Sequence, residues 1–340
     1  MQNAREIKRR QKSIGNIGQM ARAMELVSVT KMRRSQRIAF LSRPYAKAAL
    51  EVLRNIKQKT DISKSYFFGN NDEIDGTPST VNFIKNEKRT AVLLITTDKG
   101  LCGGLNTNVF RKAEKLLADL ESKNAIFKQG DATALFASEQ IVDFVVVGKK
   151  GEEWCRRKKL NVIKTFNNFG DYIDVLETAP VSEVIINIFK EKKYAQIFAV
   201  YTNFISALKQ ETVSRLILPL NEKELQDVIN GIVPQSGKFV SEAEFNDMDI
   251  VSNNKWDFEY KFEPYAEEIL DEILYSLVES EIYYIILENN ASEHSARRMA
   301  MRNAYENADE MLKSLILTYN KMRQAGITQE LTEIASAENI

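Results

Sequence analysis

The fold is decided by a long C-terminal stretch, YAEEILDEILYSLVESEIYYIILENNASEHSARRMAMRNAYENADEMLKSLILTYNKMRQA (265–325). It contains neither proline nor glycine, and as one helix it is about 90 Å long at 1.5 Å per residue. Its apolar residues recur mostly at three- and four-residue steps, as in Leu312, Leu315, Tyr319 and Met322. A globular core from the rest of the chain is too small to cover such a helix. It must therefore pair with another long helix, enter a partner, or both.

The other end of the chain predicts a second long helix of opposite charge. Residues 1–47 contain twelve Lys/Arg and two Glu, whereas residues 265–340 contain six Lys/Arg and fourteen Asp/Glu. Opposite net charges favour pairing of the two helices mainly as a long-range bias, because exposed ion pairs are individually weak. The two ends together predict a rod.

The first helix has a narrow heptad seam. One series of the repeat contains Ile7, Ile14, Ala21 and Ser28, and Ile17 and Met24 lie four residues before the last two. Gly15 and Gly18 each cost a helix about 1 kcal/mol relative to alanine, and they either loosen the helix or allow a partner backbone to approach closely. Pro44 marks a kink or stop, after which a helical pattern resumes.

The middle of the chain has an α/β pattern. Predicted strands cover 91–97, 141–147, 161–164, 195–203 and 211–219. Predicted helices cover 107–120, 151–159 and 180–192, the last with Pro180 at its start. Because strands alternate with helices, a Rossmann-like domain with a mostly parallel sheet follows.

These patterns divide the chain into five parts. The division is an N-terminal shaft helix at 1–57, a flexible loop at 58–89, an α/β foot at 90–220, an acidic linker at 221–264 and a C-terminal shaft helix at 265–340. The foot includes an extra segment at about 122–140, interpreted as a neutral loop insertion or a surface contact.

The sequence offers no catalytic, metal-binding or cofactor-binding set. Cys102 and Cys155 cannot build a disulfide framework, and Cys102 is expected to be a packed thiol. The single histidine, His294, is expected to be solvated or interfacial, and leaves little room for imidazole catalysis. No uninterrupted run of about 18 apolar residues predicts a membrane span.

The turn DKGLCGGLN (98–106) joins a strand to a helix, where an anion can bind. It matches neither GxGxxG nor GxxxxGK[ST], so nucleotide binding is a minor alternative. The favoured interpretation is a tight connection in which Gly100, Gly103 and Gly104 supply unusual backbone angles.

Two basic stretches raise nucleic-acid binding as a rival function. KRRQK (8–12) and KMRRSQR (31–37) are stripes of the kind that bind phosphate. No aromatic residue for base stacking precedes Phe40, and no nucleic-acid module surrounds the stretches. A basic helix that faces an acidic helix or acidic partner loops explains the same residues.

Four blocks of sequence resemble one known family. They are REIKRRQKSI (5–14) with ARAMELVSVTKMRRSQ (21–36), TTDKGLCGGLNTN (96–108), VESEIYYIILENNASEHSARRMAMRNAYENADEM (278–311) and YNKMRQAGITQELTEI (319–334). In their order and positions they resemble the gamma subunits of F-type ATP synthases, and the resemblance runs from end to end.

The resemblance implies that the terminal helices form an antiparallel coiled-coil shaft. The shaft would rotate inside a catalytic hexamer of alpha and beta subunits, and the foot would contact the epsilon subunit and the membrane c-ring. Ion flow would turn the shaft and so drive ATP synthesis on the partners, which makes this chain non-catalytic. It would be a peripheral membrane protein on the cytoplasmic face of the bacterial plasma membrane, with no nucleic-acid partner.

The resemblance also carries partner-contact residues over to this chain. Arg22 and Met24 match the shaft segment that faces an acidic lever of the beta subunit. Four residues near the C-terminus match tip positions that meet beta-subunit loops: Arg323, Gln324, Thr328 and Glu330. The alternative for Arg22 is a solvated helix residue. No cysteines occur in segment 122–140, so the thiol switch of chloroplast members is not expected.

Overall fold

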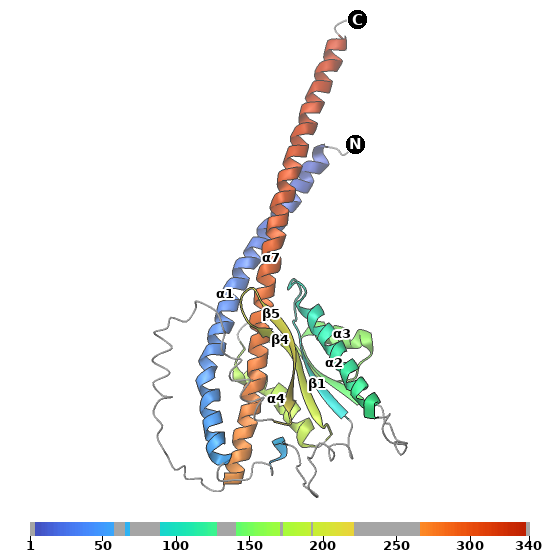
Figure 1. Ribbon diagram of the computed structural model, residues 1–340. Helices are drawn as coiled ribbons and strands as arrows, with labels where there is room; N and C mark the ends of the chain where they lie inside the picture. The colour runs from blue at the N-terminus through green and yellow to red at the C-terminus, as the bar shows by residue number, and fades with distance from the viewer. Residues whose placement is uncertain are drawn as a thin grey trace.

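The computed structural model describes residues 4–57, 65–68, 89–127, 141–170, 173–191, 193–220 and 266–337 (Figure 1). Six helical elements are described: α1 (Ala4–Lys57), η2 (Tyr66–Phe68), α2 (Leu105–Phe127), α3 (Lys149–Lys158), α4 (Val175–Lys190) and α7 (Ala266–Ala337). Five strands are described: β1 (Arg89–Ile95), β2 (Ile141–Val147), β3 (Val162–Phe166), β4 (Gln196–Phe204) and β5 (Gln210–Leu218).

The two terminal helices form an antiparallel pair that rises from the α/β domain (Figure 1). The direction of pairing follows from contacts remote in sequence: Gln11 Nε2 donates to the backbone oxygen of Leu315 at 3.0 Å, and Arg22 lies over the ring of Tyr305. The helix α1 continues through Pro44, so the predicted stop is wrong at the level of secondary structure. Gln11 lies only seven residues after the start of α1, whereas its neighbour Leu315 lies 22 residues before the end of α7. The end of α7 therefore extends past the start of α1.

The sheet has the order β3-β2-β1-β4-β5. The first four strands are parallel, and β5 pairs antiparallel with β4. A tight turn at 205–209, closed by hydrogen bonds between Ser206 and Lys209, leaves no chain for a crossover and makes this last pair a hairpin. The predicted fold class, a coiled coil of the terminal helices plus a mostly parallel α/β sheet, is confirmed.

Helices cover both faces of this sheet (Figure 1). Along β1 the side chains alternate: Leu93 packs with α4 and α7, while Val92 and Leu94 pack with α2 and α3. Because both faces of the sheet are covered, the sequence of β1 is a continuous run of apolar residues and does not alternate between apolar and polar residues. The long helix α7 therefore belongs both to the core of the α/β domain and to the rod.

Two predicted boundaries need correction. The helix α4 begins at Val175 rather than at Pro180, because the Asp174 side chain caps it by accepting a hydrogen bond from the Val175 amide at 2.7 Å. In the proposed extra segment, residues 122–127 belong to the end of α2. Three predicted parts lie wholly or mostly outside the described residues: 128–140, 221–264 and 58–89. The short helix η2 belongs to the described part of 58–89.

Candidate functional site

The seam between α1 and α7 is lined on the α1 side by a regular heptad series. It consists of residues that alternate at four and three steps and are buried or half-buried: Ile7, Gln11, Ile14, Gly18, Ala21, Glu25, Ser28, Met32 and Ser35. Many of these side chains are small or polar, so the two backbones approach closely while little apolar area is buried. The helices are thus held together weakly by comparison with an aliphatic coiled coil.

The structure corrects one of the two predicted seam series. Ile7, Ala21 and Ser28 are buried as expected, but Ile17 and Met24 are 50% and 45% exposed. Gly18 and Glu25, one residue further along, take their places. Larger apolar side chains therefore face outward, where they are available to a partner.

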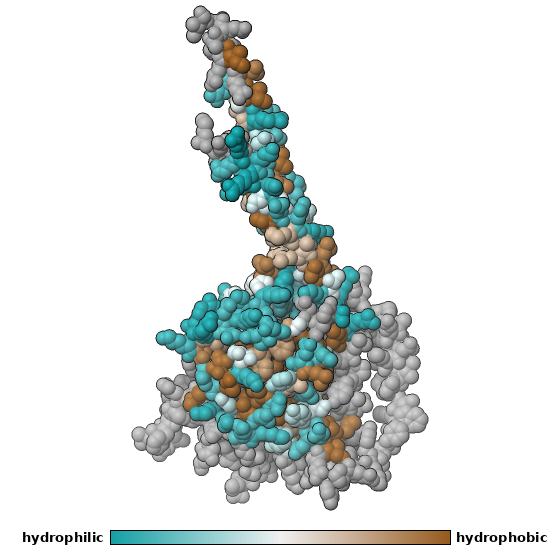
Figure 2. Space-filling view, turned by 180° about the vertical axis from the view of Figure 1, so that it is seen from behind, coloured by the Kyte–Doolittle hydropathy of each residue, from teal (hydrophilic) through white to brown (hydrophobic). Residues whose placement is uncertain are grey.

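Apolar side chains recur along the outer surface of the rod. On α1 and α7 they are Ile17, Met20, Met24, Leu26, Val27, Met311, Ile316, Leu317, Ile327, Leu331 and Ile334. On the face of the rod seen in Figure 2, brown hydrophobic residues are interleaved with teal hydrophilic ones. An exposed apolar series of this length on a soluble surface typically marks an interaction site.

Two of the predicted contact residues lie near the lower part of the rod. Met24 is half exposed and makes part of the apolar series. Arg22 has a 52% exposed side chain whose Nη1 donates to Glu25 Oε2 at 2.6 Å. Its guanidinium also lies 5.6 Å from the ring centroid of Tyr305. Arg22 is therefore a tethered side chain rather than a freely solvated one.

The other predicted contact residues lie at the tip of α7. Arg323, Gln324 and Thr328 are exposed on a single helix that extends beyond α1 (Figure 1). Glu330 lies in the same helix, but its side chain is outside the described part. Thr328 follows Tyr305 by 23 residues, so the tip lies about 35 Å from the Arg22 level. The two groups form separate contact regions on one rod.

A group of buried hydrogen bonds attaches α7 to the sheet. Asn289, Ser292 and Ser295 lie on one face of α7 and are at most 3% exposed. Asn289 Oδ1 accepts from the Thr202 amide at 3.3 Å, and Ser292 Oγ donates to the Thr202 carbonyl at 3.1 Å. Ser295 Oγ donates to the carbonyl of Ala207 at 2.8 Å. These directional bonds to β4 and its turn fix the axial position of the rod on the α/β domain.

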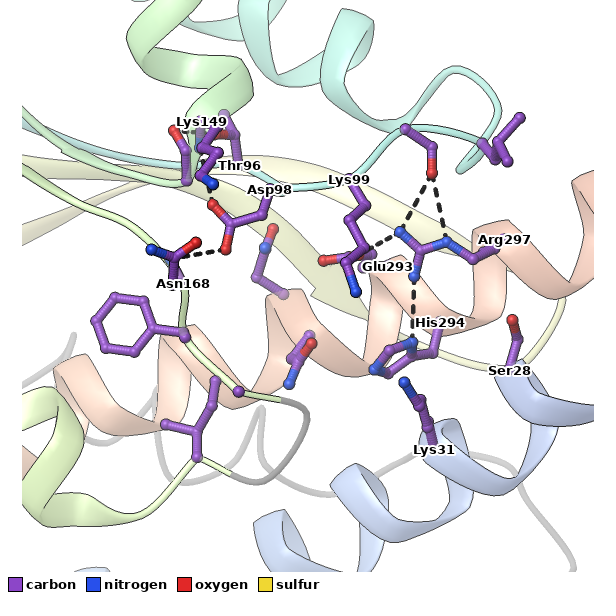
Figure 3. Close-up of a pocket in the computed structure, with 18 of the residues that line it drawn as sticks. Ser28, Lys31, Thr96, Asp98, Lys99, Lys149, Asn168, Glu293, His294 and Arg297 are labelled. Atoms are coloured by element: carbon purple, nitrogen blue, oxygen red, sulfur yellow. Dashed lines mark hydrogen bonds and ion pairs between the residues drawn. The ribbon is translucent and has the colours of Figure 1, made fainter. Parts of the chain in front are cut away.

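The turn after β1 is attached to the same helix. The guanidinium of Arg297 donates to the Gly100 carbonyl at 3.3 and 3.4 Å and pairs with Glu293. The expectation for His294 is corrected in part: it is 2% exposed and not solvated, with Nδ1 3.4 Å from Arg297 Nη1 (Figure 3). No local sequence pattern predicts this burial, because it depends on the turn after β1 and α1 covering α7.

The backbone of the turn adopts a positive φ at two positions. Gly103 has a φ of 61° and Leu101 a φ of 65°, whereas Gly100 and Gly104 have no positive φ. Only Gly103 among the three predicted glycines thus uses the left-handed conformation that glycine favours. Asn106 braces the turn, since its Oδ1 accepts from the Thr97 amide at 3.2 Å and its Nδ2 donates to Thr97 Oγ1 at 2.8 Å.

The N-terminus of α3 already holds an anion of the chain itself. Asp98 accepts hydrogen bonds from the amides of Lys149 at 3.0 Å and Asn168 at 2.9 Å. The next two amides of α3 donate to the Thr97 carbonyl and to Thr96 Oγ1. A phosphate cannot take this helix end without displacing Asp98, which disfavours a P-loop type of nucleotide site.

The nucleophile and metal chemistry of the described residues is sparse. Cys102 is 3% exposed, and burial raises the pKa of its thiol, as is typical of a packed cysteine. Burial also raises the pKa of Cys155 to about 12. Within the described ranges, no three His, Cys, Asp or Glu side chains are grouped as metal ligands. A search of the described helices for a membrane-spanning segment finds no candidate.

Comparison with known proteins relates nearly the whole chain to one family. A family model described as ATP synthase matches residues 3–339. A protein named ATP synthase gamma chain from Roseiflexus castenholzii is 32% identical over 99% of this chain and 97% of its own length. The protein of that name from Stenotrophomonas maltophilia is 33% identical over 98% of both chains.

Solved structures show the same fold. A chain in the Euglena gracilis mitochondrial ATP synthase, in a structure of OSCP, F1 and c-ring, is similar over 99% of this chain and 93% of that chain, with a TM-score of 0.59 and 18% identity. A chain of the rotor of the same enzyme aligns with a TM-score of 0.55 and 17% identity, covering 95% and 98% of the two chains.

Proposed function

Because the chain belongs to the ATP synthase gamma chain family, we propose that it is the central-stalk rotor subunit of such an enzyme. It couples ion flow through a membrane c-ring to ATP synthesis in a hexamer of alpha and beta subunits, and it does so by rotating inside that hexamer. The chain is part of an enzyme complex and carries no catalytic residue of its own in this proposal.

The observation that carries this proposal is the hydrogen-bonded joint between the rod and the α/β domain. A rotor needs a shaft that turns with its base, and side chains of α7 form hydrogen bonds with the backbone of β4 at Thr202 and of the following turn at Ala207. Torque applied to the α/β foot therefore passes into α7 without slippage. The rest of α7 then transmits this rotation to the tip.

The surface of the rod supports contact with a sleeve that it does not bind permanently. Its exposed apolar side chains include flexible methionines such as Met20, Met24 and Met311, which make weak and replaceable contacts. Arg22 and Met24 are proposed to meet the acidic lever of the beta subunit. Arg22 exchanges its intrachain partner Glu25 for that lever at each step.

The tip of α7 is proposed to be the upper bearing of the shaft. Arg323, Gln324, Thr328 and Glu330 contact beta-subunit loops there. Their position on α7 beyond the start of α1 supports this role, because Arg323, Gln324 and Thr328 are exposed there.

The foot is proposed to contact the epsilon subunit and the c-ring. In the domain division that we propose, residues 90–220 form this foot, residues 1–57 and 265–340 form the shaft, and 58–89 and 221–264 connect them. The chain is then a peripheral protein on the cytoplasmic face of a bacterial plasma membrane, and it has no nucleic-acid partner.

Coexpression with the alpha and beta subunits of the same genome tests the proposal. We expect a purified complex that contains one copy of this chain and hydrolyses ATP with rotation, observed with a bead attached to the foot. If the chain elutes apart from an assembled alpha–beta complex, the assignment fails. Retention of the free chain on DNA at about 0.15 M salt, weakening as the salt concentration rises, would instead favour the nucleic-acid alternative.

A further inference from the structure

A cavity of about 610 Å³ lies between the rod and the α/β domain (Figure 3). Its walls come from the carboxyl ends of β1 and β2, from the middle of α1 and from α7. In open α/β sheets, ligands bind beyond the carboxyl ends of the strands. The volume is in the range of small-molecule sites. In this chain, residues of α1 and α7 form the other walls of the cavity at this edge of the sheet.

The polar part of the wall carries excess positive charge. Four cationic side chains line it, Lys31, Lys99, Lys149 and Arg297, against the two acids Asp98 and Glu293. Both acids already accept hydrogen bonds from the chain: Asp98 from backbone amides, and Glu293 from Arg297. The lysines come from three different elements, α1, the turn after β1 and the start of α3, so they surround the opening rather than lie along one helix face.

Apolar side chains also line the cavity. They include Met24 and Val27 of α1, Phe169, and Ile95 and Val147 at the strand ends. Such a surface offers contact to a ring or another flat apolar group. Cationic and apolar side chains that line one cavity fit a ligand that carries both an anionic group and a ring.

We propose that this cavity binds a small organic phosphate that carries a ring, with the phosphate at Lys99 and Lys149 and the ring against Met24 and Val27. The amides of α3 do not hold the phosphate, because they are already bonded within the chain, and the lysine side chains hold it instead. Since the walls belong to α1, α7 and the foot, the bound ligand connects shaft and foot and stabilises the folded chain.

Calorimetric titration of the full-length chain with AMP and, separately, with inorganic phosphate tests this proposal at 0.15 M salt. We expect AMP to bind at least tenfold more tightly than phosphate, because only AMP uses the apolar wall. The double variant Lys99→Gln/Lys149→Gln is expected to weaken AMP binding at least tenfold through loss of two charge-assisted contacts. Both lysines are exposed, so the variant should fold, which circular dichroism verifies.

The matched control is Lys115→Gln/Lys158→Gln. It removes the same charge from exposed positions on α2 and α3 outside the cavity wall, and it should bind AMP like the unmodified chain. Equal weakening in both double variants would show general charge attraction and overturn the proposal. So would the absence of AMP binding at millimolar concentration, or equal affinity for AMP and phosphate. None of these outcomes depends on assembly with alpha and beta subunits, so they leave the rotor assignment untouched.

Discussion

Replacing Gly18 by alanine should strengthen the coiled coil. Gly18 is buried on the seam of α1, and a methyl group built there lies 3.4 Å from Cβ of Ala308 and 3.9 Å from a ring carbon of Tyr305. Both distances are ordinary van der Waals contacts, so the methyl group fits without moving either helix. The glycine is therefore not required by close packing, although it lies where the helices cross.

The magnitude follows from two contributions. Alanine is favoured over glycine in a helix by about 1 kcal/mol, chiefly because the unfolded chain loses freedom. Burial of the methyl group adds up to about 0.8 kcal/mol. Gly15→Ala should give the first contribution alone, since nothing lies within 4 Å of the added methyl group. We therefore expect about 1–2 kcal/mol for Gly18→Ala and about 1 kcal/mol for Gly15→Ala.

Urea unfolding of the full chain, followed by circular dichroism at 222 nm, measures these differences. Gly103→Ala is the control of opposite sign, because its φ of 61° strains any residue with a Cβ atom. It should destabilise the chain by about 1 kcal/mol. If Gly18→Ala is less stable than the unmodified chain while Gly15→Ala is more stable, the helices approach more closely at Gly18 than the structure has them, and the reasoning is refuted.

Three further predictions concern α7. Burial raises the pKa of the Glu288 carboxyl from its usual 4.5 to about 7, so the native chain binds this proton more tightly than the unfolded chain does. The free energy of unfolding should therefore fall as the pH rises from about 4.5 to 7. Glu288→Gln should reduce this difference between the urea midpoints measured at about pH 5 and about pH 8. Asn289→Leu leaves the buried Thr202 amide without its acceptor and should cost about 1–3 kcal/mol in the same unfolding assay, whereas an unchanged midpoint would show that this bond is dispensable. Truncation after Tyr319 should lower torque in single-molecule rotation without unfolding the 90–220 region, and loss of that region's circular dichroism signal would contradict the proposed division of the chain.

The general architecture was within reach of the sequence because it depends on local patterns. The run at 91–97 predicted β1, and 141–147 predicted β2 at its observed bounds, since buried strands consist of apolar residues that stand next to one another in the chain. Pro180 misled the prediction of α4, because the capping signal at Asp174 lies six residues earlier and competes with the stronger proline signal.

The seam of α1 shows where such patterns fail. Hydrophobicity favoured Ile17 and Met24, yet Gly18 and Glu25 face α7. Which face of α1 meets α7 depends on the residues of α7 that lie against it. The sequence of one helix alone does not contain this information.

The candidate site was foreseen only in part. Resemblance to a family predicts contacts at Arg22, Met24 and the tip residues, and these stay predictions; the structure shows that they lie in two regions of one rod. The joint at Asn289, Ser292 and Ser295 was not foreseen. Short polar residues in a helix give no signal until a strand backbone is seen to lie beside them.

The sequence by itself determined the two long terminal helices, their opposite charge and the α/β pattern between them, because helical and strand periodicity are properties of neighbouring residues. Only the tertiary structure decided the strand order, the antiparallel β5, the burial of His294 and the face that α1 turns to α7. Each of these depends on free energy gained between residues that are far apart along the chain, which no local pattern reports.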